Sequence, residues 1–163
     1  MTHTDYYSSP IGLLEIRAKE DQLLALSFLE EEQKSSVNPS DFTQEVKKQL
    51  EEYFSGVRSE FTLALAPQGT EFQEKVWQML QTIPVGQTTS YLTMARQLGD
   101  EKVIRAAASA NGKNPIAILI PCHRVIGSDG SLTGYAGGLW RKKWLLEHEQ
   151  KMLGKPVQAS LFE

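Results

Sequence analysis

The most restrictive feature of this chain is an apolar run that ends in a proline and places the only cysteine beside a histidine. Residues 116–120 read Ile-Ala-Ile-Leu-Ile, and Pro121, Cys122 and His123 follow. The run is too short for an independent helix and is rich in β-branched residues, so we expect a buried strand that Pro121 ends. A cysteine there would be held by a rigid element with one side open, as a nucleophile requires. A lone cysteine is also often an inert core residue.

The first part of the chain predicts a small α+β domain over residues 1–68. Apolar runs at 13–16 and 23–28 are separated by a polar segment, a pattern typical of a β-hairpin. Residues 61–66 alternate weakly and predict a third strand. Between them, Asp41 is expected to cap a helix with apolar side chains at helical spacing. We interpret this domain as a scaffold without chemistry of its own.

A second, mostly helical domain is expected over residues 69–163. Thr70 and Gln73 form a capping-box pattern at the start of its first helix. Two short helices at about 90–98 and 101–110, joined by a tight glycine-containing turn, predict a helix-turn-helix. The second of these is alanine-rich, which suits either close approach to another backbone or ordinary packing. An amphipathic segment with two tryptophans precedes Glu149.

The charge distribution bears on function more than the net charge does. The net charge of −3 argues against a nucleic-acid binder. However, residues 1–75 hold 14 acidic and 7 basic side chains (−7), whereas residues 76–163 hold 6 and 10 (+4). The half that contains the cysteine is therefore the cationic one, which suits a polyanionic partner with few phosphate contacts.

The sequence shows no run long enough to span a membrane and no signal-peptide pattern at its start. One cysteine permits neither an internal disulfide nor a multi-cysteine zinc site. We therefore expect a cytoplasmic protein that has no membrane partner and uses neither a metal nor another cofactor.

A cysteine next to a histidine suggests nucleophilic chemistry. A free thiol has a pKa of about 8.5, so a base or a positive field is needed to produce thiolate at neutral pH. His123 can supply the base. Because neighbouring residues point in different directions, a water bridging His123 and Cys122 is plausible.

The motifs around Cys122 resemble a known family. The segment Pro121-Cys122-His123-Arg124-Val125, with Asn114 before it and Gly134-Tyr135-x-Gly137-Gly138 and Leu145-Leu146-x-x-Glu149 after it, is similar to the O6-alkylguanine-DNA alkyltransferases in their small stand-alone bacterial form. The resemblance is strong over about residues 69–149. It implies a ribonuclease-H-like first domain, and the sequence lacks the ligands of the structural zinc that some members carry there.

The resemblance also implies a reaction and a partner. The alkyl group of O6-alkylguanine, and of O4-alkylthymine if that base is accepted, would move from duplex DNA to Cys122, which consumes the protein after one event. The base would first be flipped out of the duplex. The protein would act as a monomer, with cooperative binding along DNA as an open alternative.

The catalytic roles implied by the resemblance fall on five residues. Glu149 would orient His123 and complete a Cys-water-His-Glu relay, with His148 as a local alternative to Glu149. Asn114 would order the turn and help orient the histidine. Tyr91 would hydrogen-bond the flipped base and assist its protonation.

Other residues would bind the base or the DNA. Arg105 would fill the space that the flipped base leaves in the stack. Ala136 stands where many relatives have serine, so only a backbone N–H remains for the base there. The base-binding residues would be Tyr135, Val125, Ala136 and Gly137, and the DNA-binding residues would be Arg105, Ala106, Ser109, Lys102, Lys113 and Arg124.

Two other classes of protein fit part of the sequence. A cysteine hydrolase would explain Cys122, His123 and Glu149 but not the alanine-rich helix with Arg105. A helix-turn-helix regulator would explain the helices but not the cysteine-histidine pair. Non-catalytic alkyltransferase-like proteins have lost the cysteine that this chain keeps.

Overall fold

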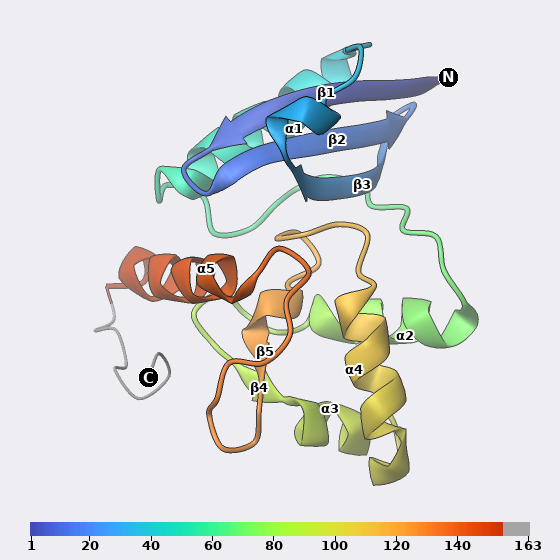
Figure 1. The fold of residues 1–163 in the computed structure, drawn as a ribbon, viewed down its shortest axis with the longest axis vertical. Coiled ribbons are helices and arrows are strands. Elements are labelled where there is room, and N and C mark those ends of the chain that lie inside the picture. The colour runs from blue at the N-terminus through green and yellow to red at the C-terminus, as the bar shows by residue number, and fades with distance from the viewer. Residues whose placement is uncertain (155–163) are drawn as a thin grey trace. The chain divides into compact units, whose positions relative to one another are not determined.

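Three antiparallel strands form the sheet in the first part of the chain: β1 (Thr2–Ser9), β2 (Gly12–Lys19) and β3 (Gln22–Leu29) (Figure 1). β2 lies in the middle and pairs Tyr6 with Glu15 on one side and Leu14 with Phe28 on the other. The hairpin between β2 and β3 was predicted from two apolar runs. Four of the eight residues of this central strand are buried: Leu13, Leu14, Ile16 and Ala18.

One helix covers this sheet. α1 (Asp41–Phe54) packs against β1 and β2 and buries apolar residues at helical spacing, including Val46 and Leu50. Its N-cap is Ser40, one residue before the predicted Asp41, and the Ser40 side chain accepts from the Thr43 N–H. A short 3-10 helix, η1 (Glu31–Gln33), precedes it.

The third strand of the sheet is not the predicted one. Residues 61–66 form no strand and contribute a single parallel bridge between Leu65 and Leu23. The third strand of the sheet is β1, although its sequence, Thr-His-Thr-Asp-Tyr-Tyr-Ser-Ser, is polar. An edge strand with one face in solvent needs few apolar residues, so the hydrophobic pattern gave no signal. The predicted α+β class with a three-stranded antiparallel sheet is confirmed.

The second part of the chain begins with α2 (Glu71–Leu80). The predicted capping box is present, because the Thr70 side chain accepts from the Gln73 N–H and the Gln73 side chain accepts from the Thr70 N–H. Trp77 is buried on this helix, and its indole N–H donates to the carbonyl of Ala110 at 2.9 Å. α2 is thereby tied to the alanine-rich helix.

The helix-turn-helix is present as predicted. It consists of α3 (Tyr91–Gln97), a turn that includes Gly99 at φ +101°, the 3-10 helix η2 (Glu101–Val103) and α4 (Ile104–Gly112). A left-handed φ of this kind favours glycine. The last helix, α5 (Leu139–Met152), is longer than the predicted amphipathic segment.

The computed structural model describes residues 1–154, and two compact units are distinguished within the chain. The first contains Met1–Gln68 and also Pro115–Ala117, which bond to Leu26 of β3 through backbone hydrogen bonds of 2.9 Å. Of the described residues, the second contains Gly69–Asn114 and residues 118–154. No helix among the described residues is long and apolar enough to cross a membrane.

The predicted strand over residues 116–120 is wrong. Ile116 makes one bridge to Leu26, and the chain then turns, with Ile118 at φ +71°. The run is nevertheless buried, since Ile116, Ile118 and Ile120 are at most 2% exposed. A short apolar run indicates burial, but it does not distinguish a strand from a buried turn.

Candidate active site

Cys122 opens a single 3-10 turn, η3 (Cys122–Arg124), at the end of the buried run. The Asn114 side chain donates to the carbonyl of Ile120 at 2.6 Å and fixes the approach to this turn. The turn leads directly into β5 (Val125–Ile126), which pairs in parallel with β4 (Thr89–Ser90). Because β4 is followed at once by α3, this short pairing holds the cysteine turn beside the start of the helix that carries Tyr91.

His123 and Glu149 meet inside the second unit. The His123 Nε2 lies 2.8 Å from a carboxylate oxygen of Glu149, and both side chains are essentially inaccessible to solvent. Burial lowers the pKa of His123, although the Glu149 charge and hydrogen bond oppose this. The imidazole is therefore neutral at pH 7 and donates its Nε2 hydrogen to Glu149. Its Nδ1 then carries the lone pair, and this buried atom has no hydrogen-bond partner among the described residues.

Arg124 contacts the same carboxylate, and its side chain is only 10% exposed. Its Nε and Nη2 donate to the two oxygens of Glu149 at 2.8 and 2.9 Å, and its Nη1 donates to the carbonyl of Ile83 at 2.6 Å. The predicted contact of Arg124 with DNA is therefore corrected. The guanidinium is buried and donates to both carboxylate oxygens of Glu149, so it binds within the protein and does not face DNA. Burial would raise the pKa of Glu149, but His123 and Arg124 outweigh it and hold that pKa far below its usual range.

His148 does not replace Glu149. Its ring stacks on Trp144, with the ring centroids 4.8 Å apart and the ring planes 20° from parallel. Glu149, one residue later on α5, carries the hydrogen bond to His123.

The surroundings of the thiol act in opposite directions on its pKa. Burial raises the pKa of Cys122, while a hydrogen bond from the Asn114 side chain and the positive charge of Lys142 lower it. Lys142 is itself buried on α5, and burial lowers its pKa to about 8. Its Nζ donates to the carbonyl of Thr133 at 2.6 Å. The thiol therefore has a nearby cation to stabilise the thiolate.

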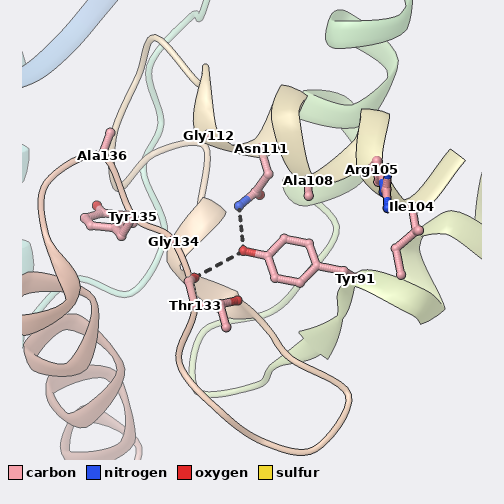
Figure 2. Close-up of a pocket in the computed structure, with 10 residues that line it drawn as sticks. All are labelled: Tyr91, Ile104, Arg105, Ala108, Asn111, Gly112, Thr133, Gly134, Tyr135 and Ala136. Atoms are coloured by element: carbon pink, nitrogen blue, oxygen red, sulfur yellow. Dashed lines mark hydrogen bonds between the residues drawn. The ribbon is translucent and has the colours of Figure 1, made fainter.

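A pocket of about 630 Å³ opens between α3, α4 and residues 133–136 (Figure 2). Tyr91 points into the centre of this region, where its hydroxyl donates to the Thr133 carbonyl at 3.3 Å and accepts from Asn111 at 3.5 Å. Of the predicted base-binding residues, Tyr135 and Ala136 line the pocket, whereas Val125 is buried in β5 and Gly137 accepts a hydrogen bond from Arg141.

The predicted DNA-binding residues other than Arg124 lie exposed on η2 and α4 or just after α4. Ala107 and Ala110 form the buried side of α4. Arg105 is exposed and also lines the pocket, so one side chain reaches both the helix surface and the pocket rim. The exposed residues are Lys102, Arg105, Ala106, Ser109 and Lys113.

Comparison with known proteins accounts for both parts of the chain. Residues 71–151 match the family model for the DNA binding domain of 6-O-methylguanine DNA methyltransferase, and residues 2–67 match the model for its ribonuclease-like domain. The chain belongs to the 6-O-methylguanine DNA methyltransferase family. The family predicted from the residues around Cys122 is thereby confirmed.

Members of the 6-O-methylguanine DNA methyltransferase family are similar over nearly the whole length. A methylated-DNA–protein-cysteine methyltransferase from Methanosarcina barkeri is 46% identical over 91% of this chain and 98% of that protein. The crystal structure of the Mycobacterium tuberculosis O6-methylguanine methyltransferase matches with a TM-score of 0.84 at 43% identity over all of both chains. A structure of the M. tuberculosis protein OGT in complex with DNA matches with a TM-score of 0.81 at 43% identity, covering 97% and 99%.

Sequence reasoning missed two polar residues at the site of this methyltransferase-family chain. Lys142 was counted only as one of the basic residues, because a lysine on a charged helix is normally solvated. Asn111 lies just beyond the helix predicted over about residues 101–110, but it is the buried penultimate residue of α4. The periodicity of the alanines, continued by one turn, would have placed Asn111 on the inner face of that helix.

Proposed function

We propose that this protein repairs DNA by moving the alkyl group of O6-alkylguanine onto Cys122. The sulfur would attack the alkyl carbon, so that an S–C bond forms while the C–O6 bond breaks and its electron pair remains on the guanine. The thiol proton leaves before the attack, and the guanine gains a proton. No co-reactant is needed, and the thioether product ends the activity of that molecule.

The carrying observation is the buried His123–Glu149 pair next to the only cysteine of a chain that matches the family in both parts. With Nε2 donating to Glu149, Nδ1 of His123 is the basic atom. It would take the Cys122 proton through a bridging water, in the Cys-water-His-Glu relay. Arg124 donates to both oxygens of Glu149 and keeps this carboxylate ionised and oriented toward His123, which supports the relay.

Thiolate formation in a buried site requires compensation for the lost solvation. The Lys142 charge and the Asn114 hydrogen bond both favour the charged form of Cys122. We therefore assign Lys142 to thiolate stabilisation, together with its contact to the Thr133 carbonyl at the pocket rim.

The pocket beside Tyr91 would receive the flipped guanine. A base inside a duplex is out of reach of a thiol, and flipping costs a few kcal/mol. The solved complex of the M. tuberculosis protein OGT with DNA supports DNA as the partner. In this assignment Tyr91 protonates the departing guanine and recovers a proton from the relay. Tyr135 and Ala136 contact the flipped base. Arg105 fills the space that the flipped base leaves in the DNA stack.

The two parts of the chain would divide the work. Residues 69–163 contain the residues proposed to bind DNA and accept the alkyl group, and residues 1–68 would act as the scaffold domain. All the proposed catalytic side chains, from Tyr91 to Glu149, belong to the second unit, which supports this division.

The proposal is tested by mixing the protein with a duplex that holds one radiolabelled O6-methylguanine. We expect one label per protein molecule and no further turnover. The Cys122→Ala variant should bind the lesion duplex but gain no label, because the DNA-facing helix is unchanged. Full label transfer by Cys122→Ala would overturn the proposal, and so would continuous turnover with release of methanol, which is the outcome expected of a hydrolase.

A further inference from the structure

Asn111 joins the cysteine turn to the tyrosine of the pocket. Its side-chain nitrogen lies 3.4 Å from the backbone carbonyl of Cys122 and 3.5 Å from the hydroxyl of Tyr91. Asn111 is 3% exposed and lines the pocket, and its amide faces the Tyr91 hydroxyl in Figure 2. One side chain thus contacts both the residue proposed as nucleophile and the residue proposed as proton donor.

The orientation of this amide follows from its partners. The Cys122 carbonyl can only accept a hydrogen bond, so the atom facing it must be the nitrogen. The reversed amide would place two acceptor oxygens against each other. The Asn111 Oδ1 has no hydrogen-bond partner among the described residues, so the side chain acts here only as a donor.

We propose that Asn111 is a positioning residue that directs the Tyr91 proton toward the base during alkyl transfer. A phenol has one hydrogen and can also accept hydrogen bonds. Because the Asn111 amide donates to the Tyr91 hydroxyl oxygen, the hydroxyl hydrogen of Tyr91 must point away from Asn111. It points to the Thr133 carbonyl in this structure and would turn to the guanine when the base enters the pocket. Asn111 itself neither gives nor takes a proton, and no bond to it changes.

This inference rests on the proposed function, and a double-mutant cycle tests it. Single-turnover transfer from an O6-methylguanine duplex is measured for wild type, Asn111→Leu, Tyr91→Phe and the double variant. Each single change should slow transfer by roughly fivefold or more, as expected for a lost hydrogen bond near a reacting group. If Asn111 acts through Tyr91, the double variant is no slower than Tyr91→Phe. Multiplying effects would overturn the inference.

The Asn111→Asp variant tests the direction of the hydrogen bond separately from the shape of the side chain. Aspartate is nearly isosteric with asparagine but accepts where asparagine donates, so the Tyr91 hydrogen should turn to the carboxylate and away from the base. We expect this variant to be as slow as Tyr91→Phe. Transfer at the wild-type rate would show that only the shape of residue 111 matters and would overturn the inference.

A titration of Tyr91 gives a readout that does not depend on alkyl transfer. The hydrogen bond from Asn111 lowers the pKa of Tyr91, against the larger effect of burial, which raises it. In the absorbance difference between each protein and its Tyr91→Phe counterpart, Tyr91 should ionise at higher pH in Asn111→Leu than in wild type. An unchanged titration of Tyr91 would overturn the inference about Asn111, whether or not the protein transfers alkyl groups. Failure of the wild-type protein to transfer an alkyl group would count only against the proposed function. Asn111→Ala replaces Asn111→Leu throughout if the leucine variant does not fold.

Discussion

At the scale of single residues, the site combines side chains that the sequence predicts with others that it does not. Cys122, His123 and Glu149 could be found because their spacing matches a family motif. Lys142 could not, because its role depends on burial and a lysine on the surface would be an ordinary solvated group. For Asn111 the alanine periodicity of α4 indicates burial, but nothing in the sequence indicates its hydrogen-bond partners. Arg124 illustrates the opposite error, since it is expected among the DNA-binding residues but is buried and bonded to Glu149.

Lys142→Met is expected to raise the pKa of the Cys122 thiol, because it removes a nearby positive charge. Each unit of increase lowers the thiolate fraction about tenfold at pH values below the pKa. Iodoacetamide alkylation of the only cysteine, followed by intact mass, should therefore be slower than in wild type at pH 7. The difference should shrink above about pH 8, where Lys142 itself loses its charge.

Lys143→Met is the matched control for that measurement. Lys143 is the next residue of α5 and is 46% exposed, with Glu147 at 3.9 Å. Its loss should leave the alkylation profile unchanged. Equal slowing in both variants would mean that Lys142 acts through general charge or stability and not through its place beside the thiol.

Glu149→Gln should lower both stability and reactivity. It leaves the buried Arg124 without a counter-charge and His123 without its anionic partner, and breaking a buried pair costs about 3–5 kcal/mol. Urea unfolding measures the first effect and label transfer the second. Glu147→Gln, at a partly exposed position of the same helix, should change stability by less than about 1 kcal/mol. A Glu149→Gln protein as stable as wild type would contradict the described network.

At the scale of elements, periodicity predicted the helices and the β2–β3 hairpin, because amphipathic patterns report directly on which face is buried. It failed for β1, a polar edge strand, and for residues 116–120, a buried turn. β1 pairs with its sequence neighbour β2, so only its polar composition hid it. The turn over residues 116–120 depends instead on backbone hydrogen bonds between residues distant in sequence, those of Leu26 with Pro115 and Ala117. The two-residue pairing of β4 with β5 left no pattern at all, although it helps to position Cys122 near Tyr91.

Arg105→Ala tests the role of α4. If Arg105 occupies the stack, its loss should slow repair of O6-methylguanine in duplex DNA by about tenfold or more. Reaction with free O6-benzylguanine, which needs no flipping, should be nearly unchanged. Both rates are measured by loss of free thiol at Cys122. Equal losses on both substrates would mean that Arg105, which also lines the pocket, supports the pocket instead.

Lys113→Ala provides the contrasting control for Arg105→Ala. Lys113 is exposed at the C-cap of α4. If Lys113 contacts only phosphate, its loss should weaken binding to damaged and undamaged duplex alike. The slope of the logarithm of the binding constant against the logarithm of the salt concentration should then fall by about one unit. A selective loss on damaged DNA would assign Lys113 to the lesion site.

At the scale of the whole molecule, the buried His123–Glu149–Arg124 group links folding to pH. The pKa of His123 is lowered in the folded protein, so below about pH 6.5 the unfolded chain binds a proton that the folded protein resists. The free energy of unfolding is therefore not reduced by His123 above about pH 6.5, and it decreases as the pH falls below that value. The lowered pKa of Glu149 adds a second loss that begins near pH 4.3, where an unfolded glutamate titrates.

His123→Phe should therefore flatten the acid side of the stability profile. The urea midpoint of wild type is expected to fall between pH 7 and pH 5, and the midpoint of the variant to fall less over the same range. The variant can be less stable at pH 7, because only the difference between the two pH values is compared. Parallel profiles would show that His123 does not resist protonation in the folded state.

The central claim, that Cys122 is the alkyl acceptor, is tested most directly by locating the transferred group. Wild-type protein is incubated with an excess of duplex that holds O6-methylguanine, digested, and its peptides are sequenced by mass spectrometry. We expect one methyl group per molecule, carried by the peptide of Cys122 and by no other, and unmodified guanine in the recovered DNA. A methyl group on another residue, or restored guanine with an unmodified Cys122, would contradict the account.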